Sequence, residues 1–217
     1  MKKIVLVLAV ILFYSMHVQA VELVKGKIIT EKDTIYVTFK IPVTTFSSEP
    51  NYIKLQEKVK YLDASGKECV LKPNYATEIQ FSYAGGTIRM LSRFKSIFLG
   101  SIFSSNLYIF LKLDIDGDVK LFNYYFRRSS GGMYNGATGM YTGGGSYTSN
   151  DYILQKGTGD LVVVHGISFK DDMSTYFSQC PALVEKIKNK TYRMADIATI
   201  VRYYNSGCRY NNGTEAR

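Results

Sequence analysis

Apolar and polar residues alternate through most of residues 21–166, in short runs separated by polar or glycine-containing turns. Successive runs flank such turns in pairs, which is the pattern of β-hairpins. The expected pairs are residues 22–30 with 35–43, 59–62 with 68–71, 79–83 with 88–91, 107–113 with 119–126, and 152–155 with 161–164. Their regular spacing predicts a mainly antiparallel β meander that is barrel-like or a sandwich.

The hydrophobic period changes after residue 166. Apolar residues then recur at intervals of three and four residues, the spacing of an amphipathic helix. The two sets are Cys180, Leu183, Val184, Ile187 and Ile197, Ile200, Val201, Tyr204, and a shorter helical turn is expected at 171–177. We therefore expect an α+β protein, with a β domain at 21–166, a C-terminal helical region at 167–208 and a disordered tail at 209–217.

Residues 129–150 interrupt the β pattern because they are rich in Gly, Ser, Thr and Tyr. Such a segment cannot bury enough apolar surface to order itself alone, so we expect a long mobile loop. Tyr134, Tyr141 and Tyr147 lie in it. Tyrosine offers a large contact area with a polar tip at low entropic cost, which makes these three the candidate contact residues. The alternative is a flexible connection in which they only fill space.

The first 20 residues have the pattern of a cleavable secretory signal. Lys2 and Lys3 precede an apolar run at 4–16, and Val18 and Ala20 occupy the −3 and −1 positions of a small-residue cleavage site. The run is shorter than the roughly 20 apolar residues of a membrane-spanning helix, which argues against an uncleaved anchor. We expect cleavage between Ala20 and Val21, and a periplasmic or extracellular mature protein without a transmembrane segment.

A second apolar stretch at 97–111 is interrupted by serines and by Asn106. We expect two strands joined by a Ser-Ser-Asn turn there, and no membrane span.

The positive net charge of the chain indicates which kinds of partner it could bind. The chain has 27 basic and 18 acidic residues, and loss of Lys2 and Lys3 lowers its formal net charge from +9 to +7. A basic exported protein meets anionic lipid, polysaccharide or extracellular DNA. The densest basic group is Lys186, Lys188, Lys190 and Arg193. No nucleic-acid-binding motif accompanies it, so we expect an envelope protein or an anionic surface as partner and no specific nucleic acid.

The three cysteines are Cys69, Cys180 and Cys208. An oxidising compartment permits a disulfide, and Cys180 and Cys208 belong to the same helical tail whereas Cys69 belongs to a strand. We therefore predict a Cys180–Cys208 bridge. The alternative is three buried thiols that act as small apolar side chains. No motif around Cys69 indicates a nucleophile.

No arrangement of residues predicts a metal site, a cofactor or a catalytic group. Asp114, Asp116 and Asp118 resemble part of a calcium loop, but Gly117 falls at position four where the calcium loop has its glycine at six. A hairpin turn explains them. The glycine-rich segment at 129–150 lacks the Gly-Lys-Ser/Thr sequence of a phosphate-binding loop.

Two kinds of hydrolytic chemistry stay open as alternatives. His165 is the only histidine of the mature chain, which excludes a multi-imidazole zinc site within one chain and leaves a single general base. Carboxylate-pair hydrolysis needs two positioned acids. The acids considered are Glu68, Glu78, Asp114 and Asp151.

The C-terminal tail resembles that of a group of exported proteins from Bacteroidota-type bacteria. The matching residues are Tyr176-Phe177-x-x-Cys180-Pro181-x-Leu183, then Ile200-Val201-x-x-Tyr204-Asn205-x-x-Cys208. Lys32-Asp33-Thr34-Ile35 matches the Gly-Asp-Thr-Ile opening of that group only in part. The resemblance implies an exported, strand-rich fold and supports the disulfide between the tail cysteines. It implies no activity.

Together these patterns favour a non-enzymatic envelope or secreted protein that acts as a binding or scaffold module. A hydrolase of envelope polymer or peptide is one alternative. A binder of anionic glycan or lipid through residues 186–193 is another.

Overall fold

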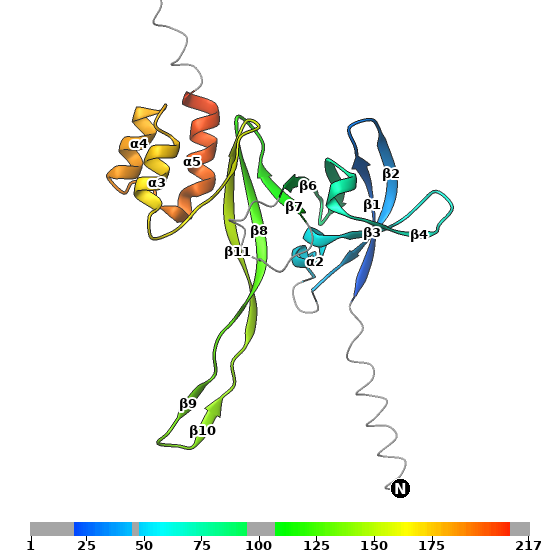
Figure 1. Ribbon diagram of the computed structural model, residues 1–217, viewed down its shortest axis with the longest axis horizontal. Helices are drawn as coiled ribbons and strands as arrows, with labels where there is room; N and C mark the ends of the chain where they lie inside the picture. The colour runs from blue at the N-terminus through cyan, green and yellow to red at the C-terminus, as the bar shows by residue number, and fades with distance from the viewer. Residues whose placement is uncertain (1–19, 45–47, 95–106, 209–217) are drawn as a thin grey trace, which may run out of the picture.

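The computed structural model describes residues 20–44, 48–94 and 107–208 (Figure 1). The signal segment 1–19, most of the apolar stretch 97–111 and the tail 209–217 lie outside these ranges, so the predictions for them stay predictions. The side chains of Met133, Tyr134, Asn135 and Thr142 lie outside the description as well. None of the helices in the described ranges has the length and apolarity to span a membrane.

The described chain is an α+β fold built on one ten-stranded antiparallel sheet, as the alternation predicts. The strands lie in the order β12-β11-β8-β7-β6-β5-β1-β2-β3-β4. Their bounds are β1 Val21–Ile29, β2 Thr34–Pro42, β3 Val59–Leu62, β4 Glu68–Leu71, β5 Glu78–Tyr83, β6 Gly86–Phe94, β7 Tyr108–Ile115, β8 Val119–Ser129, β11 Ser146–Lys156 and β12 Leu161–Val163.

All five predicted hairpin pairs are confirmed. The expected barrel or sandwich is not found, because the described strands form an open sheet with β12 at one edge and β4 at the other. The sheet consists of two meanders, which join where β1 pairs with β5. One contains β1 to β4, and the other contains β5, β6, β7, β8, β11 and β12. Gly26 is opposite Phe81 in this pair, and a Cβ at Gly26 would collide with the Gln80 carbonyl and the Phe39 ring. Glycine is therefore needed where the two meanders meet.

The two faces of the sheet carry different side chains. One face packs Phe39, Ile79 and Phe81 against Leu55 of the short helix α2, Tyr52–Glu57. The opposite face has its own apolar cluster farther along the sheet, which includes Leu111, Phe122 and Ile153. The two faces differ because successive side chains of a strand point to opposite faces of the sheet.

Three C-terminal helices pack at one end of the sheet: α3 Phe169–Tyr176, α4 Pro181–Lys188 and α5 Ile197–Tyr203. They form the helical unit, and Figure 1 shows them stacked beside β8 and β11. Their buried residues join Val119, Leu121 and Leu154 of the sheet in one cluster. The predicted helical periods are thus confirmed, and the apolar stripe of each helix is buried as its spacing requires.

Candidate functional site

The most prominent feature is a two-stranded ribbon that projects from the sheet (Figure 1). Strand β8 pairs with β7 only as far as Asn123, and β11 pairs with β12 only from Ile153 onward. Between these points β8 and β11 pair with each other alone, out to Ser129 and Ser146. We call residues 124–152 the ribbon. Residues 124–129 of β8 alone extend roughly 20 Å at about 3.4 Å per residue.

Residues 129–150 do not form the long loop that their composition predicted, because they contain paired strands. Beyond Ser129 and Ser146 the chain forms the strands β9, Met133–Asn135, and β10, Met140–Thr142, which pair in register. The Ser130 amide donates to the Gly145 carbonyl at 2.8 Å, and the Gly145 amide donates to the Ser130 hydroxyl at 3.0 Å. Composition indicated a loop because glycine and serine disfavour strands, but pairing that starts at the sheet continues through them.

The base of the ribbon is held by helix α2, at the point where β7 and β8 separate. The Gln56 side-chain amide donates to the Tyr125 carbonyl at 2.8 Å and accepts from the Tyr125 amide at 2.6 Å. Gln56 thus takes the place of a neighbouring strand for one residue. The Tyr52 ring stacks on the Tyr125 ring with centroids 4.7 Å apart. Burial raises the pKa of Tyr52 to about 12 and raises that of Tyr125 as well.

The far end of the ribbon is exposed, aromatic and nearly uncharged. Met140, Tyr141 and Tyr147 are 70%, 67% and 54% exposed. Tyr141 is opposite Tyr134 in the β9–β10 pair, and Tyr147 is opposite Arg128 in the β8–β11 pair. Arg127 and Arg128 are the only charged residues in 127–150. The three candidate tyrosines therefore all belong to the ribbon.

A chain of polar side chains crosses the sheet beside the base of the ribbon. The Lys112 ammonium donates to Asp114 at 2.8 Å, and the Asn123 amide donates to the other oxygen of Asp114. The Asn150 side-chain amide donates in turn to the side-chain oxygen of Asn123 at 2.7 Å. Asn123 is 4% exposed, so its two hydrogen bonds offset the cost of its burial. This chain orients the strands and leaves Asp114 ion-paired.

The residues of the calcium-like sequence have separate partners. Asp116 pairs with Arg89 at 2.7 Å and Lys120 at 3.2 Å, whereas Asp114 pairs with Lys112. The expected hairpin turn joins β7 to β8 at this point. No group of three or more metal-binding side chains occurs in the described part of the chain.

The side chains considered for hydrolysis are dispersed. Glu68 is bound by Lys40 and Lys60 at 2.5 and 2.7 Å, and these hydrogen bonds lower its pKa to about 2. Glu78 is bound by Arg89 at 2.6 Å. A carboxylate held ionised by cations is poorly suited to donate a proton. His165 is exposed and makes no hydrogen bond within the described ranges.

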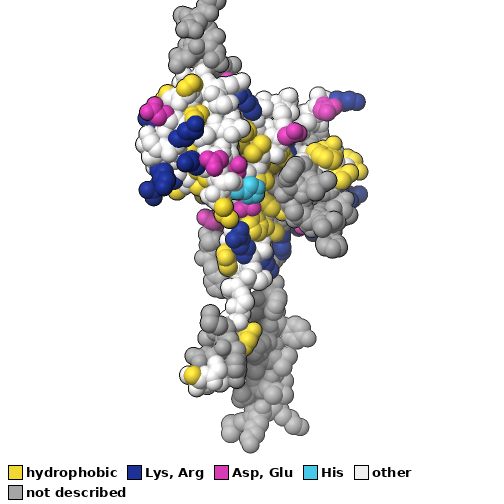
Figure 2. All heavy atoms as spheres, turned by 60° about the vertical axis from the view of Figure 1, so that its left-hand side comes forward, with side chains coloured by type: hydrophobic (Ala, Val, Ile, Leu, Met, Phe, Trp, Pro, Cys, Tyr) yellow, Lys and Arg dark blue, Asp and Glu magenta, His cyan; other side chains and the backbone are white. Residues whose placement is uncertain are grey.

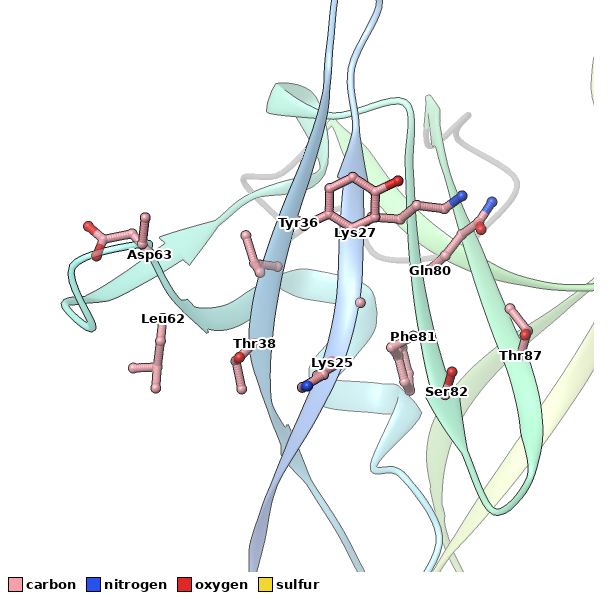
Figure 3. Close-up of a pocket in the computed structure, with 13 residues that line it drawn as sticks. Lys25, Lys27, Tyr36, Thr38, Leu62, Asp63, Gln80, Phe81, Ser82 and Thr87 are labelled. Carbon is pink, nitrogen blue, oxygen red and sulfur yellow. The ribbon is translucent and has the colours of Figure 1, made fainter.

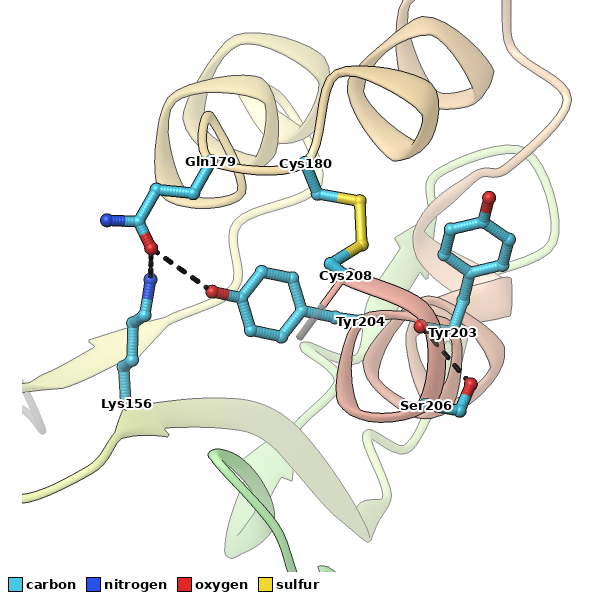
Figure 4. Close-up of a disulfide and its surroundings, with 7 residues drawn as sticks. All are labelled: Lys156, Gln179, Cys180, Tyr203, Tyr204, Ser206 and Cys208. Atoms are coloured by element: carbon cyan, nitrogen blue, oxygen red, sulfur yellow. Dashed lines mark hydrogen bonds between the residues drawn. A yellow bond between two sulfur atoms is a disulfide. The ribbon is translucent and has the colours of Figure 1, made fainter. Parts of the chain in front are cut away.

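The predicted disulfide is confirmed: Cys180 and Cys208 are bonded, with Cα atoms 5.5 Å apart (Figure 4). Cys180 precedes α4 and Cys208 follows α5, so the bond joins two helices of one buried cluster. Beside it, Lys156 of β11 donates to the Gln179 side chain at 2.6 Å and lies over the Tyr204 ring. Cys69 is a free, half-buried thiol 3.8 Å from Asp63.

The basic group at 186–193 does not form one free patch. The Lys186 ammonium lies 5.6 and 5.7 Å from the ring centroids of Tyr192 and Tyr203, a cation–π arrangement. Figure 2 shows Lys and Arg side chains spread over the helical unit among acidic ones.

Two parts of the site were missed by the sequence reasoning. Helix α2 is too short to show a hydrophobic period, and the strand character of the ribbon is masked by its composition. A signal for α2 was present in Asn51, whose side chain accepts from the Lys54 amide as an N-cap. No family model, curated protein or solved structure matches the chain.

Proposed function

We propose that this protein is an exported, non-enzymatic binding module, and that its ribbon is the contact surface for an envelope or extracellular protein. The projecting ribbon, anchored at its base and exposed at its tip, carries this proposal. Its tip offers aromatic and methionine side chains on a polar backbone, the composition of surfaces that recognise other proteins.

The ribbon also provides unpaired strand edges to a partner. Beyond the Gln56 contact, no described strand pairs with the outer edges of β8 and β11. Exposed strand edges accept an added strand from another chain through main-chain hydrogen bonds. Tyrosine side chains on either side of such a strand would supply specificity.

Export rests on residues 1–20 and on the resemblance of the tail to exported proteins of Bacteroidota-type bacteria. Two structural features support it. The first strand begins at Val21, so removal of residues 1–20 leaves β1 complete. The disulfide is typical of proteins that fold outside the cytoplasm. N-terminal sequencing of the protein from its native source should find Val21 as the first residue.

A shortened ribbon tests the contact surface. Replacement of residues 131–144 by Asn-Gly joins Ser130 to Gly145 through a two-residue hairpin turn and keeps the β8–β11 register. We expect this variant to fold with an unchanged melting temperature. Cross-linking in the native envelope, followed by binding measurements with the purified captured protein, should show at least a tenfold weaker association, about 1.4 kcal/mol.

A second variant separates side chains from backbone. Met140→Ser with Tyr141→Ser and Tyr147→Ser keeps the ribbon length and removes its exposed apolar groups. Tyr75→Ser is the matched control, because Tyr75 is equally exposed but lies on η2, Pro73–Tyr75, away from the ribbon. If the control weakened binding as much as the triple variant, or the shortened ribbon bound normally, the ribbon would not be the contact surface.

A further inference from the structure

We propose that a cleft on the sheet face opposite α2 binds an acidic polysaccharide, with Lys25 and Lys27 as the residues that recognise its anionic groups. The cleft has a volume of about 620 Å³ and lies across β6, β5, β1 and β2 (Figure 3). The β3–β4 turn borders it at Leu62, Asp63 and Ala64. This inference does not depend on the ribbon, which is formed by other strands.

Strand register arranges the lining side chains in two rows. The first row runs across the four strands as Thr87, Ser82, Lys25 and Thr38. Thr87 is opposite Ser82, and Lys25 is opposite Thr38. Ser82 and Lys25 are neighbours because each lies one residue beyond the Gly26–Phe81 pair. In the second row, Lys27 lies between Gln80 on β5 and Tyr36 on β2. Figure 3 shows these side chains on one side of the sheet. With strands about 4.8 Å apart, four strands span roughly 14 Å, the reach of a short oligosaccharide.

The lysines and three hydroxyl groups of this cleft are not used by the protein itself, whereas the Gln80 side-chain amide donates to Glu78 at 2.5 Å. Within the described residues, Lys25 and Lys27 form no ion pair. The described contacts likewise leave the hydroxyl groups of three lining residues without a partner: Thr38, Ser82 and Thr87. The one acid of the cleft, Asp63, accepts from Ser65 and from the Lys67 amide at 2.6 to 3.0 Å. The Asp63 carboxylate is therefore hydrogen-bonded within the β3–β4 turn.

This combination fits a sugar polymer with carboxylate or sulfate groups better than other anions. Two ammonium groups stand among hydroxyls and an amide, which match the hydroxyls of a sugar ring. Tyr36 is 80% exposed beside Lys27 and offers a ring face to the apolar side of a sugar. A lipid surface would call for a denser cationic patch with apolar residues to insert, and a nucleic acid for a basic stripe.

Four neighbouring cations on the sheet, in contrast, are engaged by other side chains. Lys40 and Lys60 hold Glu68, and Arg89 holds Glu78 and Asp116. Arg93 lies over the Phe122 ring and donates to Gln155 at 2.8 Å. Lys25 and Lys27 thus combine a positive charge, access from solvent and adjacent free hydroxyls.

Calorimetric titration with oligogalacturonate tests the proposal, and its fully methyl-esterified form is the neutral control with the same rings. A heparin-derived oligosaccharide distinguishes sulfate from carboxylate as the preferred anion. We expect the Lys25→Gln, Lys27→Gln double variant to bind the acidic oligosaccharide about 100-fold more weakly, about tenfold per lost charge-assisted hydrogen bond. Tyr36→Ser should weaken binding severalfold, an effect that charge alone would not produce.

The matched control is Lys188→Gln with Lys190→Gln, which makes the same change in net charge on the helical unit. Circular dichroism should show the fold of each variant intact, because all these side chains are at the surface. Equal losses in the two double variants, equal binding of the esterified form, or no binding of either acidic oligosaccharide would overturn the proposal. Cleft-dependent binding to phosphatidylglycerol vesicles without oligosaccharide binding would also overturn it. The shortened ribbon should bind the oligosaccharide normally, so the two proposals fail independently.

Discussion

Strands β8 and β11 end in two regions that are stabilised in opposite ways. At one end, Val119, Leu121 and Leu154 are buried under the helical unit. At the other end, the same two strands run into solvent as the ribbon, with exposed residues such as Tyr147. Burial of apolar area contributes about 25 cal/mol per Å², so packing stabilises the first end. The second end depends on backbone pairing and on its anchored base.

Two side-chain amides, from Gln56 and Asn205, bind the same edge of β8 at its two ends. Asn205 donates to the Val119 carbonyl and accepts from the Val119 amide, both at 2.9 Å, as Gln56 does at Tyr125. A Cβ at Gly117 would collide with Asn205, so this turn needs glycine. Strand β7 pairs between the two amides and the ribbon lies beyond Gln56. Gln56 is therefore the boundary between the packed sheet and the free ribbon.

The largest effect should come from the helical unit. We expect Cys180→Ala with Cys208→Ala to lower the free energy of unfolding by about 3–4 kcal/mol, since the bond closes a loop with a sequence separation of 28. Urea denaturation measures this difference. Cys69→Ala is the control and should change stability by less than about 1 kcal/mol, because Cys69 is unbonded. An equal loss in the control would mean that the stabilisation comes from thiol burial rather than from the bond.

A smaller effect is expected at the base of the ribbon. Gln56→Ala removes the hydrogen bonds to both the backbone N–H and the backbone C=O of Tyr125. This loss should lower the free energy of unfolding by about 1–3 kcal/mol. Hydrogen exchange at the Tyr125 amide should speed up, whereas exchange in the helical unit should change only with global stability. Glu57→Ala, on an exposed position of the same helix, is the control. Unchanged exchange at Tyr125 would show that the ribbon base does not need Gln56.

The parts of this fold that were predictable are those with local causes. Alternation predicted the β1–β2 and β3–β4 hairpins because a short turn joins the two strands of each pair, and the i, i+3, i+4 spacing predicted α4 and α5. The placement of Cys180 and Cys208 in one helical tail predicted the correct cysteine pair. For the hairpins and the helices, the signal lies within a few residues of the structure that it predicts.

The missed parts have distant causes. Pairing of β1 with β5 joins Ile29 to Glu78, and only this pairing places Lys25 and Lys27 beside the hydroxyl groups of Ser82 and Thr87. The role of Gln56 depends on Tyr125, far along the chain. An open sheet and a closed barrel require the same alternation along each strand, so periodicity could not distinguish them.

The smallest expected effect concerns the Tyr52–Tyr125 stack. Burial raises the pKa of Tyr52 to about 12 from an unfolded value near 10, although the Lys112 ammonium opposes the rise. Because the folded state retains the phenolic proton longer, the stabilisation is complete below pH 10 and is lost as pH rises toward 12. We expect the free energy of unfolding to fall more steeply over this range for the native protein than for Tyr52→Phe. Lys112→Met should raise the pKa of Tyr52 further, which chemical-shift titration of its ring would measure. Parallel stability profiles for the native protein and Tyr52→Phe would mean that the stack at the ribbon base is solvated, and that the ribbon is held by Gln56 and strand pairing alone.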